Sequence, residues 1–398
     1  MNDLTIIGRD FSLFTEDVQN LKKELFDIVS KSSFLVIGGA GTIGSATVKE
    51  IFNRNPKLLH VIDLSENNLV ELVRDLRSSA GYIDGDFKTF AIDVNSIEFQ
   101  KLCKTYKYDY VLNLSALKHV RSEKDLFTLM RLIKTNIFYP KNAYDFCVTH
   151  SGTKKYFCVS TDKASDPVNF MGASKRIMEL MLLSDSSNDS PVSLARFANV
   201  AFSDGSLLKG FENRIDNHQP IAAPHDIRRY FMTKKESGEL CLLSALLGND
   251  AEIFFPKLVE KFNLIDFKTI AIRFLESKGL QPFEATSEQE AREYFSGNDL
   301  NGKWPCYFFE TDTTGEKDIE EFFTPNEKLD SDRFNSIGII TNALPDDFAL
   351  SKLEKFKDGF LELEKSSDFR KSDLFELFNN IITNFLHVEK NKNLDEKM

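Results

Sequence analysis

The sequence has few cysteines and no excess of basic residues. Its 398 residues include five cysteines, which are widely spaced and form no C-x-x-C pair. This spacing argues against a zinc site and a disulfide framework, so we expect buried free thiols and no bound metal. The net charge of −11 argues against nucleic acid as a partner, because a phosphate backbone would be repelled.

Long apolar runs are also missing. No run reaches the roughly 18 residues that a membrane-spanning helix needs. The start, Met1-Asn2-Asp3-Leu4, lacks the basic and apolar stretches of a signal peptide. The overall composition, 42% hydrophobic and 28% charged, is typical of a globular protein. We therefore expect a cytoplasmic protein that makes no membrane contact.

Short apolar runs alternate with helical patterns through the first half of the chain. The runs lie at 34–37, 59–63, 90–93, 110–113 and 156–160, and the helical patterns at 45–53, 66–79, 97–105 and 126–150. Apolar runs bounded by turns are typical of buried parallel strands. The alternation predicts an α/β fold, a Rossmann-like doubly wound parallel sheet.

A glycine-rich loop, Gly38-Gly39-Ala40-Gly41-Thr42-Ile43-Gly44, follows the first run directly and opens a helix. The G-x-x-G-x-x-G spacing allows a tight turn and a close approach of the backbone to a pyrophosphate at the helix N-terminus. The loop therefore predicts a dinucleotide site. Its expected binding residues are Gly38, Gly41, Thr42, Ile43 and Gly44.

Residues that end the following strands refine this prediction. Asp63 ends the second run, where a carboxylate would bind the adenosine ribose and repel a 2′-phosphate, so NAD is favoured over NADP. Asp93 ends the third run, where it would either reach the adenine amine or cap a helix. The small residues Ser115 and Ala116 follow the fourth run and should line the cofactor cleft.

The rest of the chain divides around this domain. We expect an N-terminal helical arm at 1–30, because apolar residues from Phe11 to Ile28 recur at helical spacing. The arm would pack on the domain or contact another subunit. The dinucleotide-binding domain would span 31–200, followed by a smaller, partly interleaved substrate-binding lobe at 201–345. A helical C-terminal extension would cover 346–398.

The fifth run ends in Ser160-Thr161-Asp162-Lys163, at the same edge of the sheet. A threonine hydroxyl can hold a substrate alcohol, a carboxyl group can act as an acid if its pKa is raised, and an amine as a base if its pKa is lowered. Farther on, Met171 and Lys175 form M-x-x-x-K, where nicotinamide-using enzymes normally carry Y-x-x-x-K. Lys175 would hold the nicotinamide ribose, whereas Met171 cannot titrate.

These motifs resemble the extended short-chain dehydrogenase/reductase superfamily, and more narrowly the UDP-N-acetylglucosamine 4,6-dehydratases of bacterial surface-polysaccharide synthesis. Methionine in place of tyrosine is similar to a subgroup that retains configuration at C5. The resemblance runs from about Phe34 to about Glu321. It is carried by Gly38–Gly44, Ser115–Val120, Lys134–Asn136, Ser160–Ala164, Met171–Lys175, Arg196–Val200, Arg229–Thr233 and Gly315–Lys317.

The resemblance implies a hydro-lyase with bound NAD that converts UDP-N-acetylglucosamine to UDP-2-acetamido-2,6-dideoxy-4-hexulose. After oxidation at C4, Lys163 would remove the C5 proton and Asp162 would protonate the leaving C6 hydroxyl. Thr161 would bind the C4 oxygen, and either a water or Asp162 would take the C4 hydroxyl proton. A homo-oligomer is also expected. The implied substrate-binding residues are Lys118, His119, Asn136, Asn199, Ser206 and Arg229.

Three other interpretations remain open. A nucleotide-sugar 4-epimerase of the same superfamily would need chemistry only at C4 and usually keeps the tyrosine, so Asp162, Lys163 and Met171 argue against it. The sugar donor could carry GDP in place of UDP. A dinucleotide-binding regulatory or scaffold protein would have no use for the Asp162–Lys163 pair.

Overall fold

The computed structural model describes residues 3–186, 190–257, 264–297, 300–311, 317, 319–382 and 385, with the backbone alone for 296 and 297. Two residues of the motif at 315–317, Gly315 and Glu316, lie outside the described residues. Within the described ranges, no helix is both long and apolar enough to cross a membrane.

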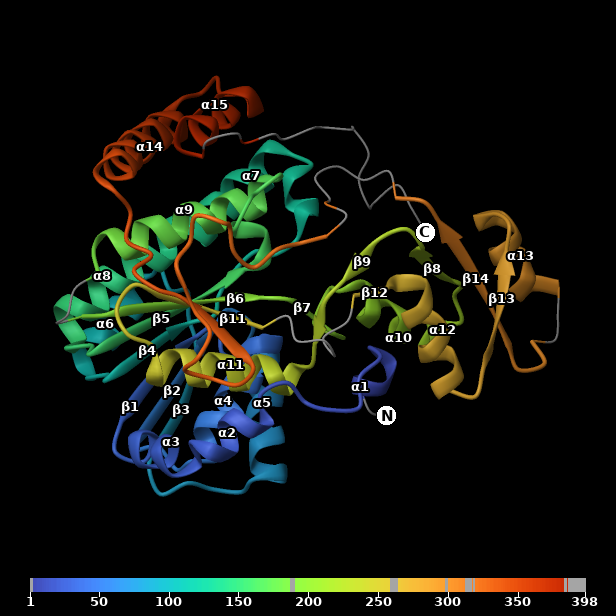
Figure 1. The fold of residues 1–398 in the computed structure, drawn as a ribbon, viewed down its shortest axis with the longest axis horizontal. Helices are drawn as coiled ribbons and strands as arrows, with labels where there is room; N and C mark the ends of the chain where they lie inside the picture. The colour runs from blue at the N-terminus through green and yellow to red at the C-terminus, as the bar shows by residue number, and fades with distance from the viewer. Residues whose placement is uncertain are drawn as a thin grey trace.

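A nine-stranded sheet forms the centre of the molecule (Figure 1), in the order β15-β16-β11-β6-β5-β4-β1-β2-β3. In this spatial order, all neighbouring strands between β11 and β3 pair in parallel, while β16 and β15 add an antiparallel edge. The sheet confirms the predicted Rossmann-like doubly wound fold. Its strands are β1 Ser33–Ile37, β2 Leu58–Asp63, β3 Asp86–Ala91, β4 Tyr110–Asn113, β5 Lys155–Thr161, β6 Val192–Phe197, β11 Glu252–Pro256, β15 Leu329–Asp330 and β16 Ile337–Ile340.

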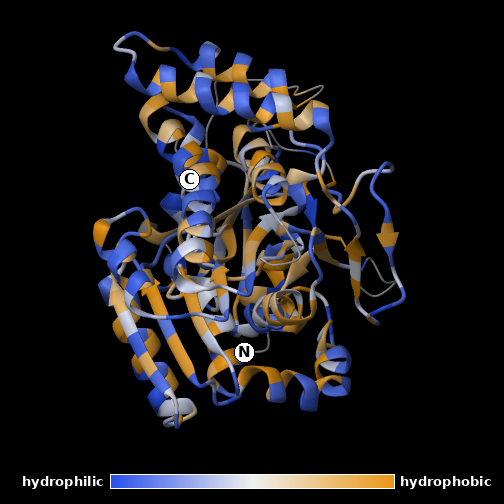
Figure 2. Ribbon diagram, turned by 90° about the vertical axis from the view of Figure 1, so that its left-hand side faces the viewer, coloured by the Kyte–Doolittle hydropathy of each residue, from blue (hydrophilic) through white to orange (hydrophobic). Residues whose placement is uncertain are grey.

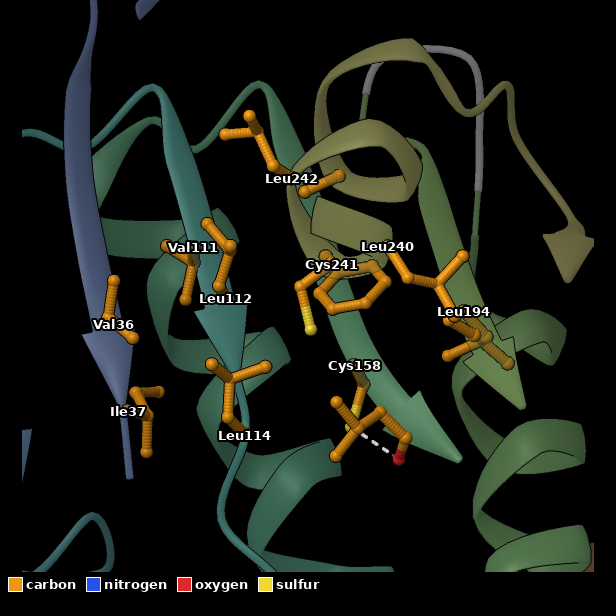
Figure 3. Close-up of a cluster of buried hydrophobic side chains, with 14 of the residues drawn as sticks. Val36, Ile37, Val111, Leu112, Leu114, Cys158, Leu194, Leu240, Cys241 and Leu242 are labelled. Carbon is orange, nitrogen blue, oxygen red and sulfur yellow. Dashed lines mark hydrogen bonds between the residues drawn. The ribbon is translucent and has the colours of Figure 1, made fainter. Parts of the chain in front are cut away.

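Helices connect these strands and cover the sheet. They are α4 Thr42–Phe52, α5 Glu66–Ser79, α6 Ile97–Thr105, α7 Leu126–Ile133, α8 Tyr139–Ser151, α9 Phe170–Ser184 and α11 Lys234–Leu247. Helix α11 presents Leu240, Cys241 and Leu242 to the apolar strands (Figure 3). Because the inner parallel strands are buried in this way, they appear in the sequence as apolar runs, whereas the edge strand β3 is partly exposed and carries polar residues among its apolar ones.

The helix predicted over 126–150 is interrupted. A π-helical turn, Lys134–Phe138, separates α7 from α8. Pro140 has no backbone N–H and cannot donate to the carbonyl of Asn136, four residues earlier, so the α-helical hydrogen-bond ladder cannot continue through this point.

The predicted N-terminal helix is also divided, into α1 Asp3–Ile6, α2 Thr15–Asn20 and α3 Lys22–Val29. Leu21 separates α2 from α3, with φ −99° and ψ 8°. This segment packs against its own chain: Phe14 is fully buried in the main core, and Arg9 forms an ion pair of 2.6 Å with the buried Glu236 of α11. The predicted homo-oligomer stays a prediction.

A second lobe lies beside the carboxyl edge of the sheet (Figure 1). Its three parallel strands are β8 Ile221–Pro224, β14 Lys303–Phe309 and β13 Gln281–Ala285, with helices α10 Leu207–Asp216, α12 Phe267–Ser277 and α13 Glu288–Gly297. Two short pairs complete it: β7 Asn199–Val200 with β10 Phe231–Met232, and β9 Arg228–Arg229 with β12 Ile265–Asp266. We keep the domain limits predicted from the sequence as a proposal.

A helical hairpin, α14 Asp347–Lys365 and α15 Lys371–Ile381, packs over α7 and α9 (Figure 1). Hydrophobic and hydrophilic residues are interspersed along its two helices (Figure 2). Phe360 stacks on Phe138 with ring centroids 4.9 Å apart, and Phe378 contacts Phe170 edge to face at 5.1 Å. The hairpin thus forms an apolar core of its own with α7 and α9.

Candidate functional site

Two adjoining cavities open at the carboxyl edge of the sheet. The β2-side cavity, beside the end of β2, encloses about 680 Å³, and the β5-side cavity, beside the end of β5, about 420 Å³. Gly38, Gly41, Leu114 and Ala116 line both. The pair lies where the strand order reverses about β1, which is where doubly wound folds bind ligands.

The glycine loop lies at the junction of the two cavities. Gly38 has φ +71°, and a Cβ there would lie 2.7 Å from the backbone nitrogen of Ser115. A Cβ on Gly44 would lie 2.1 Å from the carbonyl oxygen of Gly38. Thr42 begins α4, so its helix N-terminus points at the junction. This cradle fits the pyrophosphate of a dinucleotide.

Asp63 lines the β2-side cavity and is held in place by backbone groups. One carboxylate oxygen accepts from the Ala40 nitrogen at 3.0 Å, and the other from the Ser65 nitrogen at 2.9 Å. Ser115 also lines this cavity, with its hydroxyl donating to Asn113 Oδ1 at 2.7 Å. The carboxylate is therefore fixed beside the loop before any ligand contact.

The prediction that Asp93 ends the third strand is wrong, because β3 ends at Ala91. Asp93 Oδ1 accepts from the Asn95 nitrogen at 2.8 Å, an Asx turn that leads the chain away from the sheet toward α6. Asp93 nevertheless lines the β2-side cavity.

Three charged residues of the β2-side cavity, Arg131, Lys134 and Glu364, were not predicted as site residues, although Lys134 belongs to the Lys134–Asn136 motif. Arg131 and Lys134 lie three residues apart, on one side of the helical segment at α7, and this spacing was the available signal. Lys134 donates to Glu364 Oε1 of α14 at 2.5 Å. No local pattern could have placed Glu364 there.

Thr161, Asp162 and Lys163 lie at the end of β5, in a 3₁₀ turn. Thr161 Oγ1 donates to Asp162 Oδ1 at 2.8 Å, and Lys163 Nζ lies 3.3 Å from the same oxygen. Thr161 and Lys163 line the β5-side cavity, while Asp162 is buried just behind them. The three groups can therefore exchange protons through one carboxylate oxygen.

The pKa of Lys163 differs from the expectation that an amine acting as a base has a lowered pKa. Burial lowers the pKa of the Lys163 amine, but Asp162 and Glu320 outweigh burial, and the pKa is raised. Glu320 was missed by the sequence reasoning. Its Oε1 lies 3.4 Å from Lys163 Nζ, and burial raises the pKa of its carboxyl group.

Met171 and Lys175 both line the β5-side cavity and both are buried. Lys175 Nζ donates to the Val159 carbonyl at 2.9 Å, and burial lowers the pKa of its amine. The Met171 nitrogen donates to the carboxylate of Glu123 at 2.8 Å. The position that carries tyrosine in the Y-x-x-x-K pattern is thus an apolar part of the cavity wall.

The predicted substrate-binding residues fall into two groups. Lys118, His119, Asn199 and Ser206 line the β5-side cavity. Asn136 and Arg229 are not among its lining residues in the described structure. Asn136 is fully buried and holds the backbone of Leu117 through hydrogen bonds of 2.9 Å in both directions. Arg229 is also buried, and its charge acts on Lys163 and Glu320.

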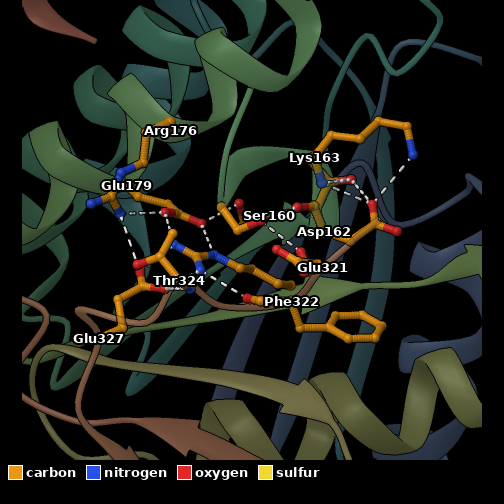
Figure 4. A network of polar contacts seen from close by, with 12 residues as sticks. Ser160, Asp162, Lys163, Arg176, Glu179, Glu321, Phe322, Thr324 and Glu327 are labelled. Atoms are coloured by element: carbon orange, nitrogen blue, oxygen red, sulfur yellow. Dashed lines mark hydrogen bonds and ion pairs between the residues drawn. The ribbon is translucent and has the colours of Figure 1, made fainter. Parts of the chain in front are cut away.

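A buried polar network supports the end of β5 (Figure 4). Ser160 Oγ donates to Glu179 at 2.6 Å, and Arg196 pairs with the same carboxylate at 2.8 Å. Arg196 also donates to the Phe322 carbonyl at 2.8 Å and pairs with Glu327 at 2.8 Å. The network ties β5 to the segment that carries Glu320.

Comparison with known proteins gives a family match and a fold match. The model of a family described as "Polysaccharide biosynthesis protein" matches residues 34–299. The capsular polysaccharide biosynthesis protein CapD of Staphylococcus aureus is 27% identical over 71% of this chain. The chain spans about half the length of that relative, 48%. A UDP-N-acetylglucosamine 4,6-dehydratase (inverting) of Campylobacter jejuni is 27% identical, covering 57% of this chain and 67% of its own.

Solved structures show the same fold at low identity. Pen from Bacillus thuringiensis superposes with a TM-score of 0.63 and 23% identity, over 79% of this chain and 90% of its own. A UDP-glucuronic acid 4-epimerase mutant from Bacillus cereus, solved with NAD and a substrate analogue, gives a TM-score of 0.53 and 16% identity over 73% and 89%.

Proposed function

Because the chain belongs to the polysaccharide biosynthesis protein family, we propose that it is a nucleotide-sugar 4,6-dehydratase that works with bound NAD. The observation that carries the proposal is the contiguous Thr161-Asp162-Lys163 group at the end of β5. Two of its residues line a cavity that shares the glycine loop with the β2-side cavity. Cofactor and substrate would therefore meet at an acid, a base and a hydroxyl.

UDP-N-acetylglucosamine is the proposed substrate, and UDP-2-acetamido-2,6-dideoxy-4-hexulose the product. The activity for which the Campylobacter relative is named supports this choice, as do Lys118, Asn199 and Ser206 around the β5-side cavity. Lys118 supplies a cation for a phosphate group, and Ser206 begins α10, whose N-terminus favours an anion. We propose that configuration at C5 is retained, because Met171 matches the subgroup with methionine in place of tyrosine, in contrast to the Campylobacter relative, which is named as inverting.

The residues present fit a dinucleotide, since the glycine loop leaves a cradle that a Cβ would fill and Asp63 faces the β2-side cavity. Asp63 would bind the adenosine ribose, which favours NAD over NADP, and Lys175 would hold the nicotinamide ribose. When bound, the nicotinamide supplies a hydride acceptor for C4 and, once reduced, a hydride donor for C6.

Proton transfers would be carried by this chain's own side chains. Thr161 would pass the C4 hydroxyl proton to Asp162 along the 2.8 Å hydrogen bond, which gives Met171 no proton-transfer role. Asp162 would then give this proton to the C6 hydroxyl as it leaves as water. Lys163 would take the C5 proton, which the C4 ketone acidifies, and later return a proton to C5.

A 4-epimerase is the second candidate, because a solved 4-epimerase shares the fold. Epimerisation needs no C5 base and no acid at C6. The Asp162–Lys163 pair beside the cavity therefore favours dehydration. A GDP-linked sugar is the other substrate to be tested.

The test is incubation with UDP-N-acetylglucosamine in deuterated water, followed by NMR. We expect a 4-keto-6-deoxy product with deuterium at C5. Asp162→Asn and Lys163→Ala should each lower turnover at least a hundredfold while NAD stays bound. Lys154→Ala, at an exposed lysine far from the cavity edge, is the matched control. Recovery of a 4-epimer that keeps its 6-hydroxyl would refute the dehydratase proposal.

A further inference from the structure

A second carboxylate faces Lys163 from a segment distant in sequence. Glu320 has a side chain 3% exposed, and its Oε1 lies 3.4 Å from Lys163 Nζ. Asp162 Oδ1 lies 3.3 Å from the same nitrogen. The Lys163 amine is therefore held between two carboxylates, only one of which belongs to the Thr161-Asp162-Lys163 group.

The position of Glu320 is fixed by hydrogen bonds on its C-terminal side. Ser165 Oγ donates to the Glu321 carbonyl at 2.6 Å, and the Asp162 carbonyl lies 2.9 Å from the same hydroxyl. Arg196 donates to the Phe322 carbonyl at 2.8 Å (Figure 4). The same two side chains thus bind the segment of Glu320 to the end of β5, and a carboxylate held by such contacts is preorganised.

We propose that Glu320 is a positioning residue that acts through Lys163, holding its Nζ at the cavity wall and stabilising the ammonium ion that forms when this amine takes up a proton. The inference rests on the proposed dehydratase reaction. Lys163 lines the β5-side cavity, whereas Glu320 is not among the described residues that line it. Glu320 therefore contacts Lys163 without lining the cavity itself.

The proton balance of this step needs no further reactant. The C5–H bond breaks, its proton forms an N–H bond on the neutral Lys163 amine, and the electron pair stays on the sugar, delocalised into the C4 ketone. That electron pair then expels the C6 hydroxyl, which takes a proton from Asp162 and leaves as water. After hydride reaches C6, the ammonium returns a proton to C5. Glu320 stabilises the charged form between these two events.

The charges around Lys163 support this role. Asp162 and Glu320 each raise the pKa of Lys163, whereas Arg229 lowers the pKa of both Lys163 and Glu320. Lys317, which pairs with Asp166 at 2.9 Å, also acts on Glu320. Burial lowers the pKa of Lys163, but the two carboxylates outweigh it and raise the pKa. A stabilised ammonium makes the amine a stronger base, with a smaller free fraction at neutral pH.

The direct test is the titration of Lys163 in the full-length, NAD-bound protein. Competitive labelling with a trace amine-reactive anhydride across a pH series, read by mass spectrometry, gives the pH midpoint at Lys163. In Glu320→Gln this midpoint should fall by about one pH unit. The matched control is Glu321→Gln, an exposed neighbour, which should leave it unchanged. Glu320→Asp should give a smaller fall, and it provides the test if Glu320→Gln does not fold.

Turnover gives an independent measurement. The limb of the kcat–pH profile that reports Lys163 should move to lower pH in Glu320→Gln, and the plateau should fall roughly threefold, because the amine is a weaker base. An unchanged labelling midpoint would overturn the proposal. So would loss of turnover at every pH with NAD retained, because Glu320 would then carry a proton itself. If the unmodified protein dehydrates no nucleotide sugar, the proposed function fails, and the labelling still reports on the Lys163–Glu320 pair.

Discussion

Two buried glutamates have pKa values shifted in opposite directions, because their neighbouring charges differ. Burial raises the pKa of Glu179, but Arg196 and Arg176 outweigh it and lower the pKa to about 2. Glu239 of α11 is 2% exposed, and Lys235 lies 3.4 Å from one of its oxygens. Among the described residues no hydrogen-bond partner reaches Glu239 Oε2. Burial therefore prevails, and with the charges of Glu50 and Glu236 it raises the pKa to about 7.

Glu239 should make stability depend on pH. Its folded-state pKa lies above the ordinary value of 4.5, so the folded state binds the proton more tightly than the unfolded chain. This stabilisation is fully present below about pH 4.5 and is lost as the pH rises through 7. The loss is roughly 3 kcal/mol. Glu239→Gln should raise the free energy of unfolding at pH 8 and change it little near pH 4.5, as measured by urea unfolding.

The control is Glu71→Gln, at a side chain 70% exposed, which should behave like the unmodified protein at both pH values. An equal effect of Glu239→Gln at both pH values would mean that Glu239 does not titrate in the folded protein as proposed.

Site residues could be predicted where a strand end carried them. Thr161, Lys163 and Asp63 follow apolar runs directly, so the parallel sheet places them at one edge. Glu320 and Glu364 could not be predicted in this way. Glu364 lines the β2-side cavity and Glu320 contacts Lys163 only because distant segments fold back over α7 and β5, and no local pattern encodes that return.

At the scale of elements, the C-terminal hairpin both packs on the sheet domain and contributes a residue to a cavity. It packs on α7 and α9 through aromatic contacts, and its Glu364 lines the β2-side cavity together with Asp63. The fold itself was largely predictable, because buried parallel strands must be apolar. The interruptions were not. The π-helical turn before Pro140 follows from a missing N–H, and the break at Leu21 occurs within a continuous helical pattern.

Loosening the hairpin should weaken cofactor binding. Phe360 is 1% exposed, and Phe360→Ala should lower the free energy of unfolding by about 3–5 kcal/mol. Because Glu364 and Lys134 line the β2-side cavity, the Kd for NAD should also rise. Thermal unfolding and NAD titration check both effects. Leu361→Ala, at a neighbour 39% exposed, is the control. An unchanged Kd in a destabilised Phe360→Ala would show that the hairpin does not shape the cofactor site.

At the scale of the whole molecule, two hydrogen-bonded bridges connect the parts on either side of the β5-side cavity. Thr42 of the glycine loop donates to Asp204 Oδ2 at 2.8 Å and accepts from the Asp204 nitrogen at 2.9 Å. Lys118 Nζ donates to Ser203 Oγ at 3.2 Å. All four residues line the β5-side cavity, so these contacts connect its two sides.

Cutting the first bridge should speed cofactor exchange. Asp204→Ala removes the acceptor of Thr42, and we expect bound NAD to exchange with labelled NAD several times faster, with little change in thermal stability because the pair is exposed. The control is Asp216→Ala, an exposed aspartate at the end of α10. Exchange at the unmodified rate in Asp204→Ala would assign cofactor retention to other contacts.

The ion pair between Lys134 and Glu364 has a consequence for biosynthesis. The two residues are 230 positions apart, and a ribosome delivers them in that order. While the nascent chain is still short of Glu364, the β1–β6 strands can assemble around the glycine loop, but one wall of the β2-side cavity is missing. The complete cofactor site would therefore form only after the hairpin has been translated. A stalled or truncated chain would have a formed sheet but an open nucleotide pocket.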